Sequence, residues 1–215
     1  MVAHGFANFY VITTRPDVAK VRRVNRLKDR PPTQVGSMTT TPRHIPSVFD
    51  FSQLPAGVSR DDVLALFDEL FARGPFGFRG PAADHIPDHL AGMDGDIRTA
   101  QVIAPGYACT SNDFLARSLA ETGTDHLFIT SANRSRHLSG APDEPAHFLA
   151  SGLQEEFGSD PRFLVLEHAD EDIARLAYPR YLPMSTTILA FHRLAGDDAG
   201  ERRTLVLERH GSLHV

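Results

Sequence analysis

Asp125-His-Leu-Phe-Ile-Thr-Ser-Ala-Asn-Arg-Ser135 passes from a short apolar run to a string of small polar side chains. The run up to Thr130 is typical of a short buried strand. Ser131, Asn133 and Ser135 follow at its carboxyl end, where hydroxyls, amides and exposed backbone N–H groups commonly bind anions or nucleotides. The alternative is an Asx or serine turn that satisfies only its own backbone.

Strand and helix signals alternate along the rest of the chain. Short apolar runs predict strands at 8–13, 101–104, 125–130, 162–167, 186–192 and 204–208. Helical apolar spacing with start and stop residues predicts helices at 18–27, 59–73, 111–122, 145–153 and 170–176. This alternation favours a single α/β or α+β domain, residues 1–215, around a mixed sheet. Gly74–Asp96, rich in proline, glycine and acidic residues, is predicted to be a mobile loop.

Length and composition exclude several classes of protein. The 215 residues suffice for one domain with its own core. Hydrophobic residues make up 41% and charged residues 23%, a globular mixture that excludes collagen, coiled coils and wholesale disorder. No run approaches the roughly 18 apolar residues of a membrane span. Because Cys109 is the single cysteine and no secretory signal is evident, we expect a cytoplasmic protein without a membrane partner.

Positive charge is concentrated at the start of the chain. Residues 1–43 hold eight basic residues against two acidic ones, although the net charge of the whole chain is −5. Lys20 and Lys28 are its only lysines, and the other 20 basic residues are arginines. The segment either binds an anionic partner or presents a solvated basic helix face.

Leu27-Lys-Asp-Arg-Pro-Pro32 is a candidate anion site at the end of the basic helix. Lys28 supplies a mobile point charge and Arg30 a rigid fork, a combination suited to phosphate or carboxylate oxygens. We expect the two groups to converge once Pro31 turns the chain. The alternative is a basic helix end that complements the helix dipole.

Two other polar segments are weaker candidates. Met184-Ser-Thr-Thr187 opens a predicted strand with hydroxyls that could reach the same ligand. Asp84-His-Ile-Pro-Asp-His89, followed by Asp94 and Asp96, has the paired histidines of a zinc helix, but Pro87 lies between them and no third ligand follows at a recognised spacing. A solvated loop is favoured there, so no metal site is predicted. The sequence also lacks the Gly-x-Ser-x-Gly, Gly-x-Gly-x-x-Gly and P-loop motifs.

The order of these segments resembles the YrdC-like family, which is centred on threonylcarbamoyl-AMP synthases. The resemblance is carried by the strand with Tyr10, the Lys-x-Arg pair, Ile129–Ser135, Ser185–Ile188 and the closing Leu207–Gly211. It implies an open, twisted mixed sheet flanked by helices, whose concave, positively charged face holds an adenine nucleotide. It also implies an enzyme that joins ATP with Mg²⁺, bicarbonate and threonine, or carbamoyl phosphate, into a threonylcarbamoyl- or carbamoyl-adenylate and releases pyrophosphate. A partner protein then transfers the group to tRNA or another acceptor.

The resemblance also implies roles for individual residues. Lys28 and Arg30 would bind triphosphate oxygens and stabilise charge on the leaving pyrophosphate, which makes them the catalytic pair of a reaction without a covalent nucleophile. The other nucleotide ligands would be Ser131, Asn133, Ser185, Thr186 and, less securely, Arg209. Tyr10 would belong to the substrate pocket.

Three positions depart from the family pattern. Gln34 stands in place of a lysine, Gly77 in place of a threonine and Ile103 in place of an arginine. We therefore expect a pocket less positive than a full triphosphate site. Three hypotheses remain: an adenylate-forming enzyme using threonine or another substrate, a non-catalytic nucleotide- or RNA-binding module on the same fold, and an unrelated α/β protein.

Overall fold

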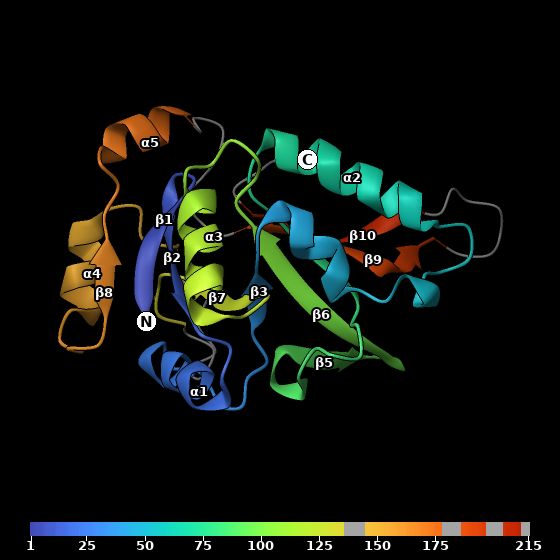
Figure 1. Ribbon diagram of the computed structural model, residues 1–215, viewed down its shortest axis with the longest axis horizontal. Helices are drawn as coiled ribbons and strands as arrows, with labels where there is room; N and C mark the ends of the chain where they lie inside the picture. Colours follow the sequence, from blue (N-terminus) through green and yellow to red (C-terminus); the bar gives the residue numbers. More distant parts are fainter. Residues whose placement is uncertain (136–144, 178–185, 197–203, 212–215) are drawn as a thin grey trace.

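Residues 1–135, 145–177, 186–196 and 204–211 are described by the structure, a computed structural model, and they contain a ten-stranded mixed sheet (Figure 1). Its strands are β1 (Val2–Phe6), β2 (Phe9–Thr14), β3 (Ser37–Thr39), β4 (Phe76–Pro81), β5 (Ala91–Asp94), β6 (Ile97–Ala104), β7 (Leu127–Ser131), β8 (Leu164–Leu166), β9 (Thr187–Ala195) and β10 (Thr204–Arg209). They follow the order β10-β9-β4-β6-β3-β7-β2-β1-β8, with β5 paired to β6 outside this path. β1 is antiparallel to β2 and parallel to β8, whereas β4 is antiparallel to β6 and parallel to β9.

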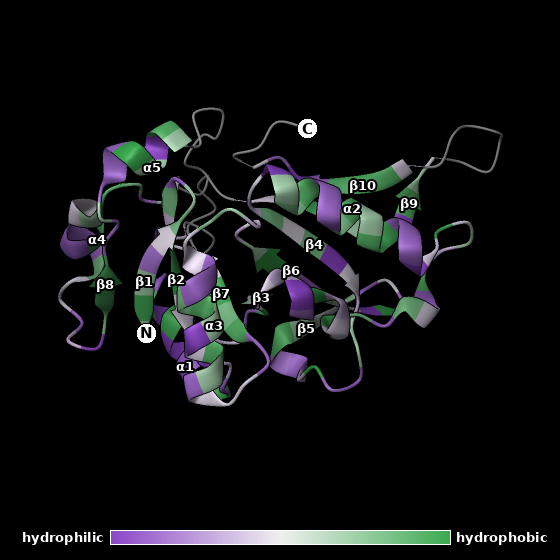
Figure 2. Ribbon diagram, turned by 45° about the horizontal axis from the view of Figure 1, so that its top comes forward, coloured by the Kyte–Doolittle hydropathy of each residue, from purple (hydrophilic) through white to green (hydrophobic). Residues whose placement is uncertain are grey.

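Helices flank this sheet, which confirms the predicted α/β architecture. They are α1 (Val18–Leu27), α2 (Arg60–Arg73), α3 (Ser111–Thr122), α4 (Ala150–Phe157) and α5 (Glu171–Ala177). Figure 1 shows α1, α3 and α4 around the half of the sheet with β1, β2 and β8, and α2 along the half with β9 and β10. Hydrophilic and hydrophobic residues alternate along α2 and α3 in Figure 2, as expected for helices with one buried face. None of the helices in the described residues is long and apolar enough to cross a membrane.

The alternation of side chains along β4 separates the core from the opposite face of the sheet. Phe78 is fully buried and packs against the phenylalanine rings of α2. Gly77 and Arg79 therefore point to the other face, because successive residues of a strand alternate. The register between β4 and β6 pairs Gly77 with Ile103 and Arg79 with Gln101. These four positions form a surface turned away from α2.

The fourth helix begins later than predicted, at Ala150 rather than near Pro145. The preceding residues are extended, because His147 makes backbone hydrogen bonds with two other segments. The amide of Tyr10 donates to the carbonyl of His147 at 2.8 Å, and the amide of His147 donates to the carbonyl of Ala132 at 2.9 Å. These tertiary hydrogen bonds override the local helix-start signal of proline.

The prediction of a mobile loop over Gly74–Asp96 is wrong, because the segment contains β4 and β5. Its glycines disguise the strand pattern, but Gly80 is required by packing. A Cβ atom on Gly80 would lie 2.0 Å from the ring of Phe191 on β9. The sequence patterns also do not predict β1 or β3, which are short or interrupted by glycine and polar residues.

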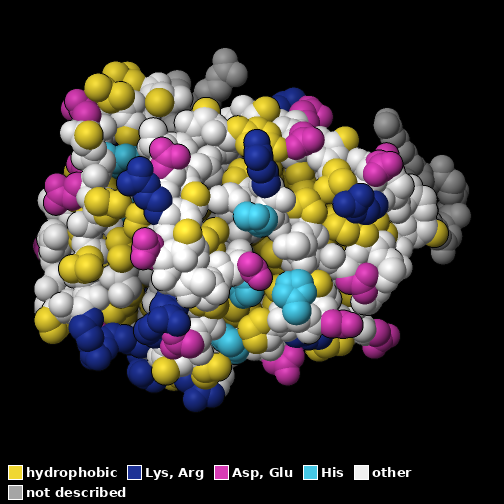
Figure 3. Space-filling model, viewed as in Figure 1, with side chains coloured by type: hydrophobic (Ala, Val, Ile, Leu, Met, Phe, Trp, Pro, Cys, Tyr) yellow, Lys and Arg dark blue, Asp and Glu magenta, His cyan; other side chains and the backbone are white. Residues whose placement is uncertain are grey.

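The basic residues of α1 lie largely on its outer side, and Figure 3 shows lysine and arginine side chains gathered over this helix. Lys20, Arg22 and Arg26 are exposed. Arg23 is half-buried and pairs with Asp160 at 2.5 Å. The helix thus presents a solvated basic face, while Val21 and Val24 pack inward.

Candidate functional site

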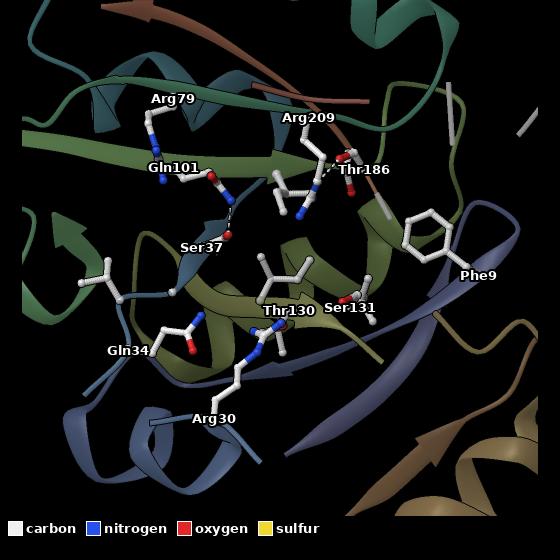
Figure 4. Close-up of a pocket in the computed structure, with 15 residues that line it drawn as sticks. Phe9, Arg30, Gln34, Ser37, Arg79, Gln101, Thr130, Ser131, Thr186 and Arg209 are labelled. Atoms are coloured by element: carbon white, nitrogen blue, oxygen red, sulfur yellow. Dashed lines mark hydrogen bonds between the residues drawn. The ribbon is translucent and has the colours of Figure 1, made fainter. Parts of the chain in front are cut away.

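A cavity of about 260 Å³ opens on the sheet face turned away from α2. It is lined from β2, β4, β6, β7 and β10, from the segment after α1, and from Thr186 just before β9 (Figure 4). The described lining includes three arginines and no aspartate or glutamate. Its polar members are Arg30, Gln34, Ser37, Arg79, Gln101, Thr130, Ser131, Thr186 and Arg209. A concave polar lining with this charge suits an anionic ligand.

Arg30 reaches the cavity because the chain turns sharply after α1. Asp29 adopts a left-handed backbone with φ of 56°, a conformation that aspartate tolerates better than most residues. The helix therefore ends at Leu27, ahead of the two prolines. Arg30 donates from Nη1 to the Thr130 hydroxyl at 2.9 Å. Figure 4 shows its guanidinium rising into the cavity beside Thr130.

Lys28 lies behind the cavity wall and is not among the residues that line it. Its side chain is fully buried. The ammonium donates to the carbonyl oxygen of Ser131 and, at 3.4 Å, to Oδ1 of Asn133. The amide of Ser135 donates to the carbonyl of Lys28 at 2.9 Å. Lys28 and Arg30 thus converge on one loop, as expected, but Lys28 holds the loop from inside.

The end of β7 and the loop after it contribute one residue that lines the cavity and one that is internal. Ser131 lines the cavity at the end of the strand. Asn133 is buried, and its Nδ2 donates to the carbonyl of Arg134 at 2.9 Å while its Oδ1 receives Lys28. The predicted anion-binding segment is therefore the end of β7, held in place by the buried side chains of Lys28 and Asn133.

The late segment that the resemblance predicts to bind the nucleotide is only partly described. Thr186 and Arg209 both line the cavity, and Arg209 donates from Nε to the carbonyl of Thr186 at 2.9 Å. Figure 4 shows Arg209 pointing into the cavity from the side opposite Arg30. Ser185 lies outside the described residues. The less secure prediction for Arg209 thus coincides with a cavity position.

Tyr10 points away from the cavity, although its neighbours on β2, Phe9 and Val11, line it. The alternation of strand side chains requires this arrangement. The Tyr10 hydroxyl donates to Glu171 at 2.7 Å and accepts the amide of His168 at 3.0 Å. Burial, together with the hydrogen bond to Glu171, raises the pKa of the tyrosine. Its observed contacts fasten α5 to the sheet.

Arg79 and Gln101 are among the cavity residues that were not predicted from the sequence. Arg79 and Gln101 lie opposite each other on β4 and β6, and Gln101 donates to the Ser37 hydroxyl at 2.5 Å. Arg79 pairs with Glu208 of β10 at 3.2 Å. The one sign of this strand in the sequence is Arg79 between the pairs Gly77-Phe78 and Gly80-Pro81. Loops contain the same pattern.

The histidine-rich segment is not assembled as a zinc site in the described residues. Three potential metal ligands instead lie together elsewhere: Asp94, His192 and Glu208, with ligand atoms within 4.8 Å of one another. Arg193 contacts Asp94 at 3.2 Å and Glu208 at 3.0 Å. The hydrogen bond from His192 holds the pKa of Asp94 below its usual range. With arginines already at the carboxylates, this group is a charge network that supports the cavity from behind.

No family model and no curated protein matches the sequence, but solved structures match its fold. The chain aligns over 98% of its length with 82% of YciO from E. coli (TM-score 0.60, 15% identity). It aligns equally far with 80% of the hypothetical protein smu.1377c from Streptococcus mutans UA159 (TM-score 0.61, 13% identity). P. abyssi Sua5 complexed with L-threonine matches 89% of the chain (TM-score 0.56, 17% identity), which spans 47% of that protein, about half its length. The chain has the YrdC-like fold.

Within this YrdC-like fold, the positions that depart from the family pattern line or support the cavity. Ile103 lies on its floor with Phe9, and Gln34 stands on the wall next to Arg30. A Cβ atom on Gly77 would come within 2.9 Å of Ile188 and 3.3 Å of Ile103. Gly77, Ile103 and Ile188 are therefore packed so closely that a larger residue at 77 would displace the two isoleucine side chains.

Proposed function

We propose that the cavity binds the phosphates of an adenine nucleotide and forms a carbamoyl- or threonylcarbamoyl-adenylate. The observation that carries this proposal is the convergence of Arg30, Ser131, Thr186 and Arg209 on one cavity. These residues come from four separate segments, and the resemblance implies a nucleotide-binding role for each. The likeness in fold to P. abyssi Sua5 complexed with L-threonine supports an amino acid as co-substrate.

The proposed reaction needs binding and charge stabilisation from the protein. An amine and bicarbonate give a carbamate and water; where carbamoyl phosphate is the source, its hydrolysis supplies the carbamate. A carbamate oxygen attacks the α-phosphorus, and the new P–O bond forms as the bond to pyrophosphate breaks. Arg30 and Arg209 stabilise the charge that develops on pyrophosphate, while Ser131 and Thr186 orient the α-phosphate. Mg²⁺ arrives with the nucleotide as part of the substrate, because the described lining offers no carboxylate to hold it. The adenylate then passes its carbamoyl or threonylcarbamoyl group to tRNA or another acceptor and releases AMP.

Lys28 is a positioning residue in this proposal. Its ammonium fixes the carbonyl of Ser131 and the side chain of Asn133, and so sets where the Ser131 hydroxyl lies. Arg30 is the member of the Lys-x-Arg pair that touches the ligand. The pair thus divides into one residue that binds and one that shapes the loop.

Titration with Mg·ATP, followed by calorimetry, tests nucleotide binding. We expect Arg30→Ala to weaken affinity about 10- to 100-fold, because a charge-assisted hydrogen bond contributes about 1.5–3 kcal/mol. Arg26→Ala, on the exposed side of α1, is the matched control and keeps wild-type affinity. Absence of wild-type binding at millimolar Mg·ATP contradicts the proposal.

A second candidate function is binding without catalysis, favoured by Gln34, Gly77 and Ile103 at positions where the family pattern has polar or basic side chains. Pyrophosphate release in the presence of ATP, bicarbonate or carbamoyl phosphate, and an amino-acid panel distinguishes the two. Nucleotide binding without pyrophosphate release with any member selects the binding module. If RNA is the ligand of that module, its affinity falls steeply with salt because counterions are released.

A further inference from the structure

A second hollow, of about 390 Å³, adjoins the proposed nucleotide cavity. The two share a common border made of Val35, Gly36, Ser37, Arg79 and Gln101. Beyond this border the second hollow is lined by Leu90, Gly92, Met93 and Thr99, from β5, β6 and the turn before β5. None of the residues implied by the family resemblance lies in its described lining.

Arg79 is held at the border by a network of charges. Its Nη1 contacts Glu208 at 3.2 Å, and Glu208 is also bound by Arg193 at 3.0 Å. Arg193 in turn contacts Asp94, which accepts a hydrogen bond from His192 at 2.8 Å. The side chain of Arg79 is 36% exposed. Because a guanidinium carries five N–H donors and only Nη1 contacts a described side chain, its other donors are available to a ligand.

The lining of the second hollow also includes apolar side chains. Met93 is 66% exposed and Val35 is 45% exposed, while Leu90 is fully buried behind them. The Thr99 hydroxyl donates to the carbonyl of Gly92 at 3.1 Å and holds β5 in place. Covering the two exposed side chains with apolar ligand atoms would remove apolar surface from water and favour binding.

Glycine at position 92 keeps this hollow open. A Cβ atom there would have Val35 as its nearest neighbours, at an ordinary 3.9 Å. A branched side chain at 92 would therefore enter the hollow without disturbing the backbone. Gly92 does not line the proposed nucleotide cavity. A larger residue at this position should therefore block the second hollow alone.

We propose that the second hollow holds a carboxylic-acid co-substrate whose apolar side chain is larger than that of threonine. Arg79 binds the carboxylate at the border, and Val35 and Met93 contact the apolar side chain. This inference rests on the proposed function, since the acid would be presented to the nucleotide bound next to it. An α-amino acid such as leucine or methionine has the required chemistry.

Thermal unfolding with added L-leucine, L-methionine, L-threonine or L-serine tests this assignment, with and without Mg·ATP. We expect leucine or methionine to stabilise the wild type more than threonine or serine do. Arg79→Gln should weaken acid binding at least tenfold, and Gly92→Val should weaken it similarly by filling the hollow. Arg117→Gln, exposed on α3, is the control for a lost surface charge.

The nucleotide response separates this proposal from the one it rests on. Gly92→Val that loses the acid response but keeps the Mg·ATP response supports the second hollow. An acid response unchanged in Gly92→Val, or a preference for threonine or serine, overturns the assignment. The assignment is also overturned if Arg79→Gln loses the Mg·ATP response but keeps the acid response, because Arg79 would then bind the nucleotide. Acid binding without any Mg·ATP binding preserves the hollow and rejects the nucleotide proposal.

Discussion

The two sides of the cavity are built differently. We define the Arg30 wall as Arg30, Thr130 and Ser131, with Lys28 buried behind them. We define the Arg79 wall as Arg79, Gln101 and Arg209, with a carboxylate network behind it. The first is a loop at a strand end, fixed by a lysine that donates to carbonyl oxygens. The second is a sheet surface, fixed by ion pairs between β4, β5, β9 and β10.

This difference affects what each wall can do. The residues of the Arg30 wall lie in or beside sequence segments that follow one another in the order of the family pattern. The shared fold therefore determines which side chains this wall presents. The Arg79 wall depends on strand register, since Arg79 meets Glu208 across 129 residues of sequence. Proteins of this fold can therefore share the Arg30 wall and differ at the Arg79 wall. A different co-substrate would be accommodated at the Arg79 wall.

Low pH should produce the largest difference between the two walls. It should destabilise the side of the sheet that carries the Arg30 wall. His4 of β1 pairs with Val11, a cavity residue, and burial lowers the pKa of His4 from 6.5 to about 4. Between these values the unfolded chain binds the proton more readily, so stability falls as pH decreases. At about 1.36 kcal/mol per pH unit, the loss is about 3 kcal/mol by pH 4.

Urea unfolding at several pH values measures this effect in the wild type and in His4→Phe. The variant should lose less stability between pH 6.5 and 4, because phenylalanine does not titrate. The Arg79 wall should persist further into acid, since the pKa of Asp94 is held low by His192 and its stabilisation disappears only as pH falls through that lowered pKa. Parallel pH curves for the two proteins would refute the assignment to His4.

Lys28→Met should have the next largest effect, on the Arg30 wall alone. The variant removes the buried ammonium that donates to the carbonyl of Ser131 and to Oδ1 of Asn133. Losing a hydrogen bond from a charged donor costs about 1.5–3 kcal/mol, which urea unfolding would detect. Lys20→Met, at an exposed position on α1, should change stability by less than about 0.5 kcal/mol. Equal effects in both variants would show that Lys28 has no special role.

Glu208→Gln should have the smallest effect, on the Arg79 wall. The change keeps the shape of the side chain but removes the charge shared by Arg79 and Arg193. Because both arginines are partly exposed, the expected loss in the free energy of unfolding is only about 0.5–1 kcal/mol. Glu69→Gln, from the exposed pair with Arg73 on α2, is the control and should change nothing measurable. A larger loss at 69 than at 208 would contradict the network.

The sequence predicts the fold class and the Arg30 wall because both depend on local patterns. Apolar strands and capped helices can be recognised in the sequence, and Arg30, Thr130 and Ser131 lie beside them. Burial of Lys28 could not be predicted, because lysine is almost never fully buried without partners supplied by the tertiary structure. Arg79 was missed because glycines that serve packing, such as Gly80 under Phe191, resemble glycines that serve turns.

The pairing of β1 with β8 has a consequence for how the chain is made. β1 finds β2 within a few residues, but β8 and the Glu171 partner of Tyr10 follow about 160 residues later. At about 5–20 residues per second, a ribosome takes roughly 10–30 s to supply them. During that interval one edge of β1 is open to pairing with other chains. A nascent chain that ends just before Leu164 therefore still presents this open edge.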